Sequence, residues 1–452
     1  MQKPLLAVLM ASAFMMLDAQ AADLIQVYQQ ALANDAAYAS ARASLAAGME
    51  RVPQGRSALL PSIQANGSYT RNTGDFSPWN QGAQIQLPDG SFTTVPGSNN
   101  SSNNNQATIS LVQPLFRWAN WQNYEQSKLL QAIAEAQFAQ AQQDLITRVS
   151  QAYFDVLAAQ DTLELTRAQK TATTEQLASA KRNFEVGTQT ITDTHEAQAA
   201  YDLVVAQEYA AHNDLENKRS ALQAIIGTAP AALAPLKPNV LLSAPEPGAI
   251  EPWVSSAETQ NYGVTSAQLS YESSKREIEK SRSGHYPTLD LIASASRSKA
   301  GGQYAGSGTQ DSKAIGVQWS VPIFSGFAVT SRVRETIALE EKARQDLEST
   351  RRNAALGARQ AFLGVNSGLA QVRALQAAEV SSTSALESNK LGYQVGVRIN
   401  IDVLNAQRQL YSTRRDLARA RYDTIINGLR LKAAAGSLRE ADLVPVNNLL
   451  AK

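Results

Sequence analysis

Residues 184–193 read Phe-Glu-Val-Gly-Thr-Gln-Thr-Ile-Thr-Asp, and residues 393–402 read Tyr-Gln-Val-Gly-Val-Arg-Ile-Asn-Ile-Asp. Gly187 therefore corresponds to Gly396, and Asp193 to Asp402, at a separation of 209 residues. The same separation relates three further pairs of positions: Ala152-Tyr153-Phe154 and Ala361-Phe362-Leu363, Ala197-Gln198 and Ala406-Gln407, and Gly227 and Gly436. A repeat that keeps one spacing over this length indicates a duplicated structural unit. We expect the two copies to contribute to one shared body.

Long helices surround the repeated stretch. Residues 118–186 and 326–395 contain no proline, and Ala, Gln, Glu, Arg and Leu are common in both. At ~1.5 Å per residue each stretch predicts a helix on the order of 100 Å long. Gly187 and Gly396 are suited to end these helices in the left-handed conformation. A returning helix then leads to Gly227 or Gly436, so each copy predicts a long helical hairpin.

Period-two alternation of apolar and polar residues predicts four β-strands, two before each long hairpin. The apolar sets are Ile63, Ala65, Gly67 and Tyr69; Ile109, Leu111 and Leu115; Leu289, Leu291, Ala293 and Ala295; and Ile315, Val317, Trp319, Val321 and Ile323. Strands of about ten residues are long enough to cross a membrane when tilted. Four strands cannot close a barrel, and an open edge cannot face lipid. Membrane strands would thus require several copies of the chain.

The remaining segments complete the domain organisation. Residues 24–60 are expected to be helical, and residues 74–105 and 301–311, rich in Gly, Ser, Asn and Gln, are expected to be loops. Six prolines within residues 228–252 predict a linker between the copies. The organisation is then a first repeat at 22–227, the linker at 228–252 (an equatorial region), a second repeat at 253–436 and a tail at 437–452.

The N-terminus predicts export. Lys3 precedes an apolar run at residues 5–17, and Ala19-Gln-Ala21 provides small residues for cleavage, so residues 1–21 are predicted to be a signal peptide. There is no cysteine, which excludes disulfides and thiolate metal sites. With 41 basic and 40 acidic residues the net charge is +1, and nothing favours a nucleic-acid partner.

Several motifs, in this order, resemble the TolC family of outer-membrane channel-tunnels. They are Asp23-Leu-Ile-Gln-Val-Tyr-Gln-Gln30, Ala152-Tyr-Phe-Asp-Val-Leu157, Ile191-Thr-Asp193, Gly284-His-Tyr-Pro-Thr-Leu-Asp-Leu291, and Gly392-Tyr-Gln-Val-Gly396 with Asp402-Val-Leu404. The resemblance implies an α+β, mainly α fold. In it, a homotrimer forms a 12-stranded barrel in the lipid of the Gram-negative outer membrane, and the long helices continue as a coiled-coil periplasmic tunnel. It implies a passive exit duct for toxic compounds, secreted proteins or both. The partners would be a periplasmic adaptor and an inner-membrane transporter of the RND, ABC or MFS type.

The same resemblance places a gate at the helical tips, closed at rest. It assigns the gate network to Thr192, Asp193, Tyr393 and Arg398, and it makes the turns at Gly187 and Gly396 adaptor contacts. Asp402 would form a ring of three carboxylates in the entrance of the trimer. Asn405 occupies the position that holds a second carboxylate ring in the TolC family, so the resemblance implies weaker cation selectivity here.

Catalytic and metal sites are not expected. The three histidines, His195, His212 and His285, are far apart in sequence and have no partners at metal-ligand spacing. The glycines of residues 301–308 lack the Gly-Lys-Ser/Thr ending of a phosphate-binding loop. No cofactor is expected, and an enzyme is disfavoured. Two other classes remain as alternatives: a periplasmic coiled-coil adaptor, which needs one hairpin and a membrane anchor, and a conventional porin, which needs more strands and no long helices.

Overall fold

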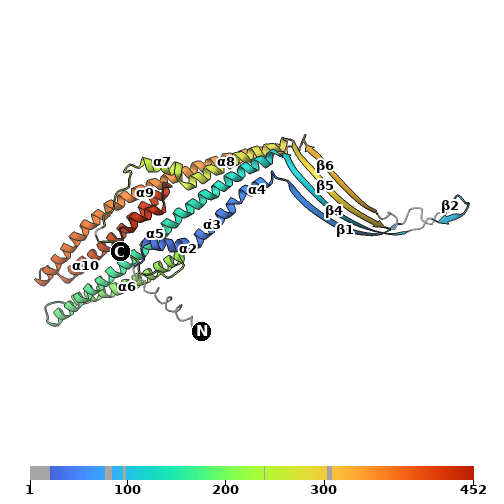
Figure 1. Ribbon diagram of the computed structural model, residues 1–452. Coiled ribbons are helices and arrows are strands. Elements are labelled where there is room, and N and C mark those ends of the chain that lie inside the picture. Colours follow the sequence, from blue (N-terminus) through green and yellow to red (C-terminus); the bar gives the residue numbers. More distant parts are fainter. Residues whose placement is uncertain (1–20, 77–83, 95–97, 239, 303–307, 452) are drawn as a thin grey trace, which may run out of the picture. The chain divides into compact units, whose positions relative to one another are not determined.

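The computed structural model describes residues 21–76, 84–94, 98–238, 240–302 and 308–451 (Figure 1). The predicted signal peptide therefore lies almost entirely outside the described residues. Two compact units are present. The sheet unit contains Gly48–Ala132 and Leu269–Arg344, and the hairpin unit contains the rest of the described chain. Each unit takes segments from both sequence repeats, so the repeats and the compact units divide the chain differently.

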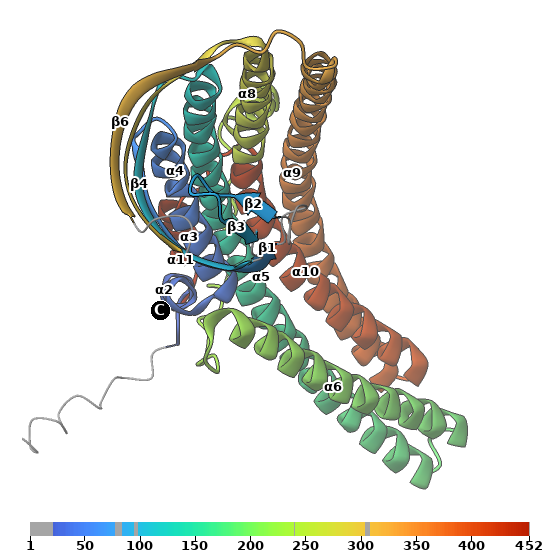
Figure 2. The same ribbon diagram turned by 90° about the vertical axis from the view of Figure 1, so that its right-hand side faces the viewer.

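A four-stranded antiparallel sheet, with the strand order β1-β4-β5-β6, lies in the sheet unit together with helical segments (Figures 1 and 2). Its strands are β1 (Ser62–Phe76), β4 (Ser98–Phe116), β5 (Thr288–Gly302) and β6 (Gly308–Ser320). The central pair joins the two repeats, since Ile109 of β4 lies opposite Ala295 of β5. Among the described residues, no strand pairs with the outer edge of β1 or of β6.

The strands are longer than the expected ten residues, at 15, 19, 15 and 13 residues. The loop expected at residues 74–105 is shorter than predicted, because β1 extends to Phe76 and β4 begins at Ser98. The Ser and Asn residues of this segment have low strand propensity, but antiparallel backbone pairing does not depend on the side chain. A short hairpin of β2 (Gln84–Gln86) and β3 (Phe92–Thr94) lies between them. The loop expected at 301–311 is likewise shortened by β5 and β6, and its centre at 303–307 lies outside the described residues.

Two long helical hairpins follow the strands, as predicted. α5 (Trp118–Glu185) returns as α6 (Ile191–Ile226), and α9 (Ala328–Gln394) returns as α10 (Asn400–Ala434). The turn glycines Gly187 and Gly396 have φ angles of +78° and +80°, which side chains with a Cβ rarely adopt. Throughout the described ranges, no helix carries an apolar stretch long enough to span a bilayer.

Three helices replace the single one expected at residues 24–60: α2 (Leu24–Asn34), α3 (Ala36–Met49) and α4 (Arg51–Ser57). Asp35 causes the first break, because its backbone is extended and its carboxylate accepts a 2.6 Å hydrogen bond from the Tyr38 N–H. The same carboxylate forms an ion pair with Arg148 at 2.9 Å. This local capping competes with an uninterrupted helix.

The linker, the segment around Ala22 and the segment around Leu450 meet in the core of the hairpin unit. Tyr153 is fully buried, and its hydroxyl lies 2.8 Å from the carbonyl oxygen of Ala234 and 3.2 Å from that of Ala22. Leu236 of the linker forms a β-bridge with Leu450 of the tail. The other helices within the described ranges are α7 (Glu251–Gln260), α8 (Tyr262–Arg282), α11 (Leu443–Asn447) and the short 3-10 turns Ser283–His285 and Glu440–Asp442.

Candidate gate at the helical tips

The tips of the two hairpins have the same backbone construction. In the first, the Gly187 N–H donates to the Phe184 carbonyl at 3.0 Å and the Thr188 N–H donates to the Asn183 carbonyl at 2.8 Å. In the second, Gly396 and Val397 make the equivalent bonds at 3.1 and 2.8 Å. These bonds satisfy carbonyls that a helix end leaves free. The duplication has thus preserved these two bonds of the turn, and the second tip adds a bond from the Arg398 N–H to the Gly392 carbonyl at 3.0 Å.

The first hairpin caps its own returning helix. Thr190 is the N-cap of α6, and its N–H and hydroxyl donate to the Asp193 carboxylate at 3.1 and 2.8 Å. The Asp193 N–H donates in turn to the Thr190 hydroxyl at 3.4 Å. This reciprocal arrangement is a capping box, and the carboxylate also interacts favourably with the helix N-terminus.

The second hairpin lacks that cap. Ile399 is the N-cap of α10 and has no side chain that can accept a hydrogen bond. Asp402, the equivalent of Asp193, lies 3.6 Å from a guanidinium nitrogen of Arg398, four residues earlier. Both side chains of this pair are substantially exposed, so its contribution to stability is small.

A tyrosine of the second hairpin links it to the first. The Tyr393 hydroxyl lies 2.5 Å from Nε2 and 2.8 Å from Oε1 of Gln189, which belongs to the first turn. The side-chain amide of Asn183 is 3.5 Å from the same hydroxyl. These contacts span more than 200 residues of sequence and connect the two copies at their tips.

A buried asparagine makes the second link. Asn400 is fully buried, and its side-chain amide donates to the Asp193 carbonyl at 3.0 Å. Its side-chain oxygen accepts a 2.6 Å hydrogen bond from Gln176 of α5. Around it, α5, α6 and α10 pack through a small apolar cluster of Leu177, Ala180, Ala197 and Leu404. Because a buried amide is costly when unpaired, this arrangement fixes how α10 sits against the first hairpin.

The structure brings together some of the residues expected in the gate. Tyr393 bridges the hairpins, Asp193 caps its own helix, and Arg398, in the turn before α10, pairs with Asp402 of the same hairpin. Thr192 is exposed. Among the hydrogen bonds and ion pairs of the residues that the structure describes, none joins the Asp193 carboxylate to Arg398 or to Tyr393.

Sequence reasoning missed Gln176, Gln189 and Asn400 as linking residues. A signal for Asn400 was available. It interrupts Ile399 and Ile401, and the first repeat has Ile191 at the equivalent position. A polar residue on a buried face of one copy alone indicates a specific partner. Gln176 and Gln189 carry no such signal, because glutamine is common along all the long helices.

The expected carboxylate position and its neutral neighbour lie one turn apart on α10. Asn405 is exposed, and its side-chain oxygen is contacted by the guanidinium of Arg408. Arg398, in the turn before this helix, and Arg408, on the helix, therefore flank Asp402 and Asn405. The local charge is less negative than Asp402 alone would suggest.

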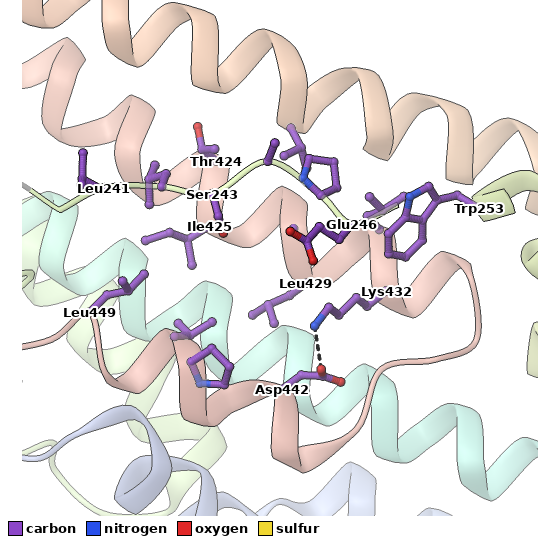
Figure 3. Close-up of a pocket in the computed structure, with 18 residues that line it drawn as sticks. Leu241, Ser243, Glu246, Trp253, Thr424, Ile425, Leu429, Lys432, Asp442 and Leu449 are labelled. Carbon is purple, nitrogen blue, oxygen red and sulfur yellow. Dashed lines mark hydrogen bonds and ion pairs between the residues drawn. The ribbon is translucent and has the colours of Figure 1, made fainter. Parts of the chain in front are cut away.

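A separate cavity of about 580 Å³ lies in the hairpin unit, where the linker passes over α10 (Figure 3). Its wall is mainly apolar, with Trp253, Leu429 and Leu449 among the lining residues. An ion pair between Lys432 and Asp442, at 2.7 Å, lies at its edge. The lining offers no pairing of a nucleophile with a base, and no group of three or more potential metal ligands occurs within the described part of the chain. We therefore place the candidate function at the tips.

Comparison with known proteins agrees with this fold. The chain is 34% identical over 445 residues to the outer membrane protein TolC of Escherichia coli, covering 96% of this chain and 86% of that protein. It is 32% identical to the proteases secretion protein PrtF of Dickeya chrysanthemi, covering 94% and 90%. The crystal structure of the CmeC outer membrane channel of Campylobacter jejuni superposes with a TM-score of 0.76 at 17% identity, covering 95% and 90%.

The sequence profile of one family matches most of the chain, in two segments. These segments are residues 27–228 and 253–437, on either side of the proline-rich linker. The protein belongs to the outer membrane efflux protein family.

Proposed function

We propose that the protein is an exit duct of the outer membrane, through which small toxic compounds, secreted proteins or both leave the cell. The carrying observation is the four-stranded sheet, which has two unpaired edges, at β1 and β6. Unpaired backbone groups cannot face lipid, so the sheet must be closed by further copies of the chain. Three copies give twelve strands, an even number within the range of closed membrane barrels.

The hairpins supply the second part of the duct. α5 has 68 residues and α9 has 67, so each is on the order of 100 Å long at ~1.5 Å per residue. With the two hairpins of each chain, a trimer has twelve helical segments with which to line a periplasmic tunnel. An adaptor has one such hairpin and a membrane anchor, and a porin has many strands and no such helices. Two hairpins with four strands fit neither class.

The proposed gate is the set of contacts at the hairpin tips. Tyr393–Gln189 and Asn400–Asp193 hold the second hairpin to the first, while the Thr190–Asp193 capping box holds the first hairpin to itself. Hydrogen bonds of this kind stabilise by about 0.5–1.5 kcal/mol each. Three copies would favour the closed state by a few kcal/mol. An adaptor that binds the open state better can reverse a difference of this size.

Partners are proposed on the same basis. An inner-membrane transporter of the RND, ABC or MFS type and a periplasmic adaptor would supply the energy for transport. One relative is named for protease secretion, and the family is named for efflux. Both kinds of cargo are therefore proposed.

Membrane fractionation combined with native mass measurement tests the proposal. We expect a trimer in the outer membrane fraction that conducts ions in planar bilayers. A soluble monomer would overturn the duct. To assign the cargo, a deletion strain is profiled both for drug sensitivity and for its secreted proteins. If deletion impairs only drug resistance or only protein secretion, and reintroducing the gene restores it, the impaired process identifies the main cargo.

A further inference from the structure

The pairing register of the sheet assigns each strand residue to one of two faces. Residues opposite each other share a face, and alternate residues along a strand share a face. Ile63, Leu111, Ala293 and Ile315 form one row across all four strands. This row defines the apolar face. The opposite face carries Ser, Thr, Asn, Gln and Gly at most positions, with Val112 and Ile292 as apolar exceptions.

The apolar residues of this face form a band whose length is comparable with the thickness of a membrane. From Leu289 to Ala295 the band runs about 20 Å along β5, and from Phe116 to Ala107 about 30 Å along β4, at ~3.3 Å per residue. Trp319 marks the helical end of the band on β6 and is 71% exposed in the single chain. Aromatic residues commonly occupy such membrane borders. This face is therefore the one that contacts lipid.

At the end of the band away from the helices, four basic residues appear on the same face. This basic rim consists of Arg71 on β1, Arg297 and Lys299 on β5, and Lys313 on β6, all exposed. Nearer the helices, the apolar face has no charged residue in the described strands. The opposite face has a single charge, Asp290, which is paired with Arg117 at 2.6 Å. The apolar face of the strands thus carries four basic and two acidic residues, Asp75 and Asp311, so its net charge is positive.

The border of the basic rim is slanted across the sheet. Lys313 lies in the row of Ala65, Arg297 one row further out opposite Asp311, and Arg71 two rows beyond Arg297. Strands in a barrel are tilted, so a level membrane border crosses successive strands at shifted positions. A slanted line of charges is what a level border produces.

Three cations of the basic rim lie close together. Arg297 and Lys313 occupy diagonal positions on neighbouring strands, about 7–8 Å apart at their α-carbons, and Lys299 is two residues beyond Arg297. Arg297 is paired with Asp311 at 2.7 Å. No carboxylate lies within ion-pair distance of Lys299 or Lys313 in the described residues, and segments 77–83, 95–97 and 303–307 contain no acidic residue. Two lysines are left to bind an external anion.

We propose that the basic rim binds the phosphate groups of the anionic glycolipid in the outer leaflet of the membrane. The proposal rests on the proposed function, because it requires the sheet to lie in the outer membrane. Long basic side chains at the edge of an apolar band reach the head-group level, where phosphates carry the negative charge. The rim lies at the end of the strands away from the helices, which is the outer leaflet if the helices are periplasmic. The rim would hold lipid against the duct and exclude water from its lipid-facing wall.

Native mass spectrometry of the purified full-length protein in detergent, titrated with bisphosphorylated lipid A, tests this. Lys299→Gln with Lys313→Gln should weaken binding by about fivefold per lysine, roughly 25-fold together. Asp311→Asn is the matched control, since it alters the same patch without removing a cation, and it should bind as well as wild type or better. Lipid A without phosphates should bind the wild-type protein no more tightly than bisphosphorylated lipid A binds the double variant. Phosphatidylglycerol should bind more weakly than lipid A.

Equal binding of bisphosphorylated lipid A by wild type and the double variant would overturn the proposal. So would wild-type binding of phosphate-free lipid A, or of phosphatidylglycerol, as tight as that of bisphosphorylated lipid A. Fractionation separates this failure from failure of the duct. If both proteins are conducting outer-membrane trimers with equal lipid affinity, only the lipid site is wrong. A wild-type protein absent from the outer membrane would instead refute the proposed function.

Discussion

Thr190 and Ile399 occupy equivalent positions in the two hairpin turns, but only Thr190 provides a side-chain cap for the helix that follows. Thr190 caps α6 through Asp193, whereas Ile399 leaves the first turn of α10 without a side-chain cap. The second tip is instead held by contacts with the first hairpin. Tyr393 contacts Gln189. Asn400 accepts a hydrogen bond from Gln176 and donates one to the Asp193 carbonyl.

This difference shows how a duplicated unit acquires a moving part. Both copies keep the long helices and the glycine turn, so both form the same wall. Only the second depends on contacts with its neighbour to fix its tip. We therefore expect the second hairpin to move when the duct opens and the first to stay in place. The following changes break or sharpen that contrast.

Removing both links from the second hairpin should have the largest effect. Tyr393→Phe with Asn400→Ala removes the hydroxyl and the buried amide, and leaves Gln176 and the Asp193 carbonyl without their partner. The closed state should lose about 2–4 kcal/mol per chain. Single-channel recordings in planar bilayers should show a severalfold rise in conductance.

Thr192→Ala is the matched control for that experiment. Thr192 is exposed in the single chain, so its side chain is free to contact another chain of the proposed trimer. Unchanged conductance in this variant assigns the closed state to links within the chain. Unchanged conductance in the double variant would contradict the proposed gate.

Exchanging the caps should alter the local stability of each tip by about 1 kcal/mol. Ile399→Thr gives α10 the capping hydroxyl that α6 has, and it should slow hydrogen exchange in the first turn of α10 by about fivefold. Thr190→Ala removes the cap of α6 and should accelerate exchange in the first turn of that helix by a similar factor. Peptide-resolved exchange measured by mass spectrometry reports both turns in one experiment. Equal protection of the two turns in wild type would show that the missing cap has no consequence.

How far the sequence predicts this molecule depends on the range of the interaction. The ends of the long helices follow from local chemistry, because Gly187 and Gly396 stop them wherever the rest of the chain lies. The outward extension of the strands was missed because Ser98–Asn105 is paired by its backbone with a distant strand, and side-chain patterns do not report that. The break at Asp35 depends on a local cap that the helical period concealed.

The same distinction applies at the tips. Tyr393 could be assigned by resemblance, but its partner Gln189 lies 204 residues away and is an ordinary helix-surface residue by type. Arg398 and Asp193 have the charges of an ion pair, yet each finds a closer partner within its own hairpin, Asp402 and Thr190. Residue type alone cannot choose between a partner in the same helix and one in the other hairpin.

Charge changes at the start of α10 and in the turn before it should have a smaller effect, since exposed ion pairs contribute about 0.2–1 kcal/mol. Asp402→Ala should weaken block of the channel by a trivalent cation. Arg398→Ser should strengthen it, because it removes the cation 3.6 Å from Asp402, and should also raise conductance by loosening the tip. Asn405→Asp should strengthen block only modestly, because Arg408 already contacts this side chain. Identical block in wild type and all three variants would refute the carboxylate entrance.

The smallest effect on the duct is expected in the shaft, by which we mean the part of the two hairpins away from their tips. The hairpins are also joined there. The Tyr422 hydroxyl of α10 donates to the Asp161 carboxylate of α5 at 2.7 Å. Burial raises the pKa of Asp161 above its ordinary value of 3.8, although the hydrogen bond from Tyr422 opposes this. Between pH 3.8 and the raised pKa of Asp161, the folded protein binds more protons than the unfolded chain. The contribution of this carboxyl to stability therefore falls as the pH rises through that range.

Asp161→Asn removes the buried charge and keeps an oxygen that can accept the hydrogen bond. We expect it to raise the thermal midpoint at pH 7 by about 2–4 °C, with a smaller difference near pH 4, and to leave conductance unchanged. Tyr422→Phe, the control, removes the hydrogen bond without adding charge and should lower the midpoint. Circular dichroism melting of the purified protein between pH 4 and pH 8 measures both. An Asp161→Asn protein that melts below wild type at pH 7, and approaches it only in acid, would show that the ionised carboxylate stabilises the shaft. The two hairpins would then be held together by charge along their length as well as by the neutral links at their tips.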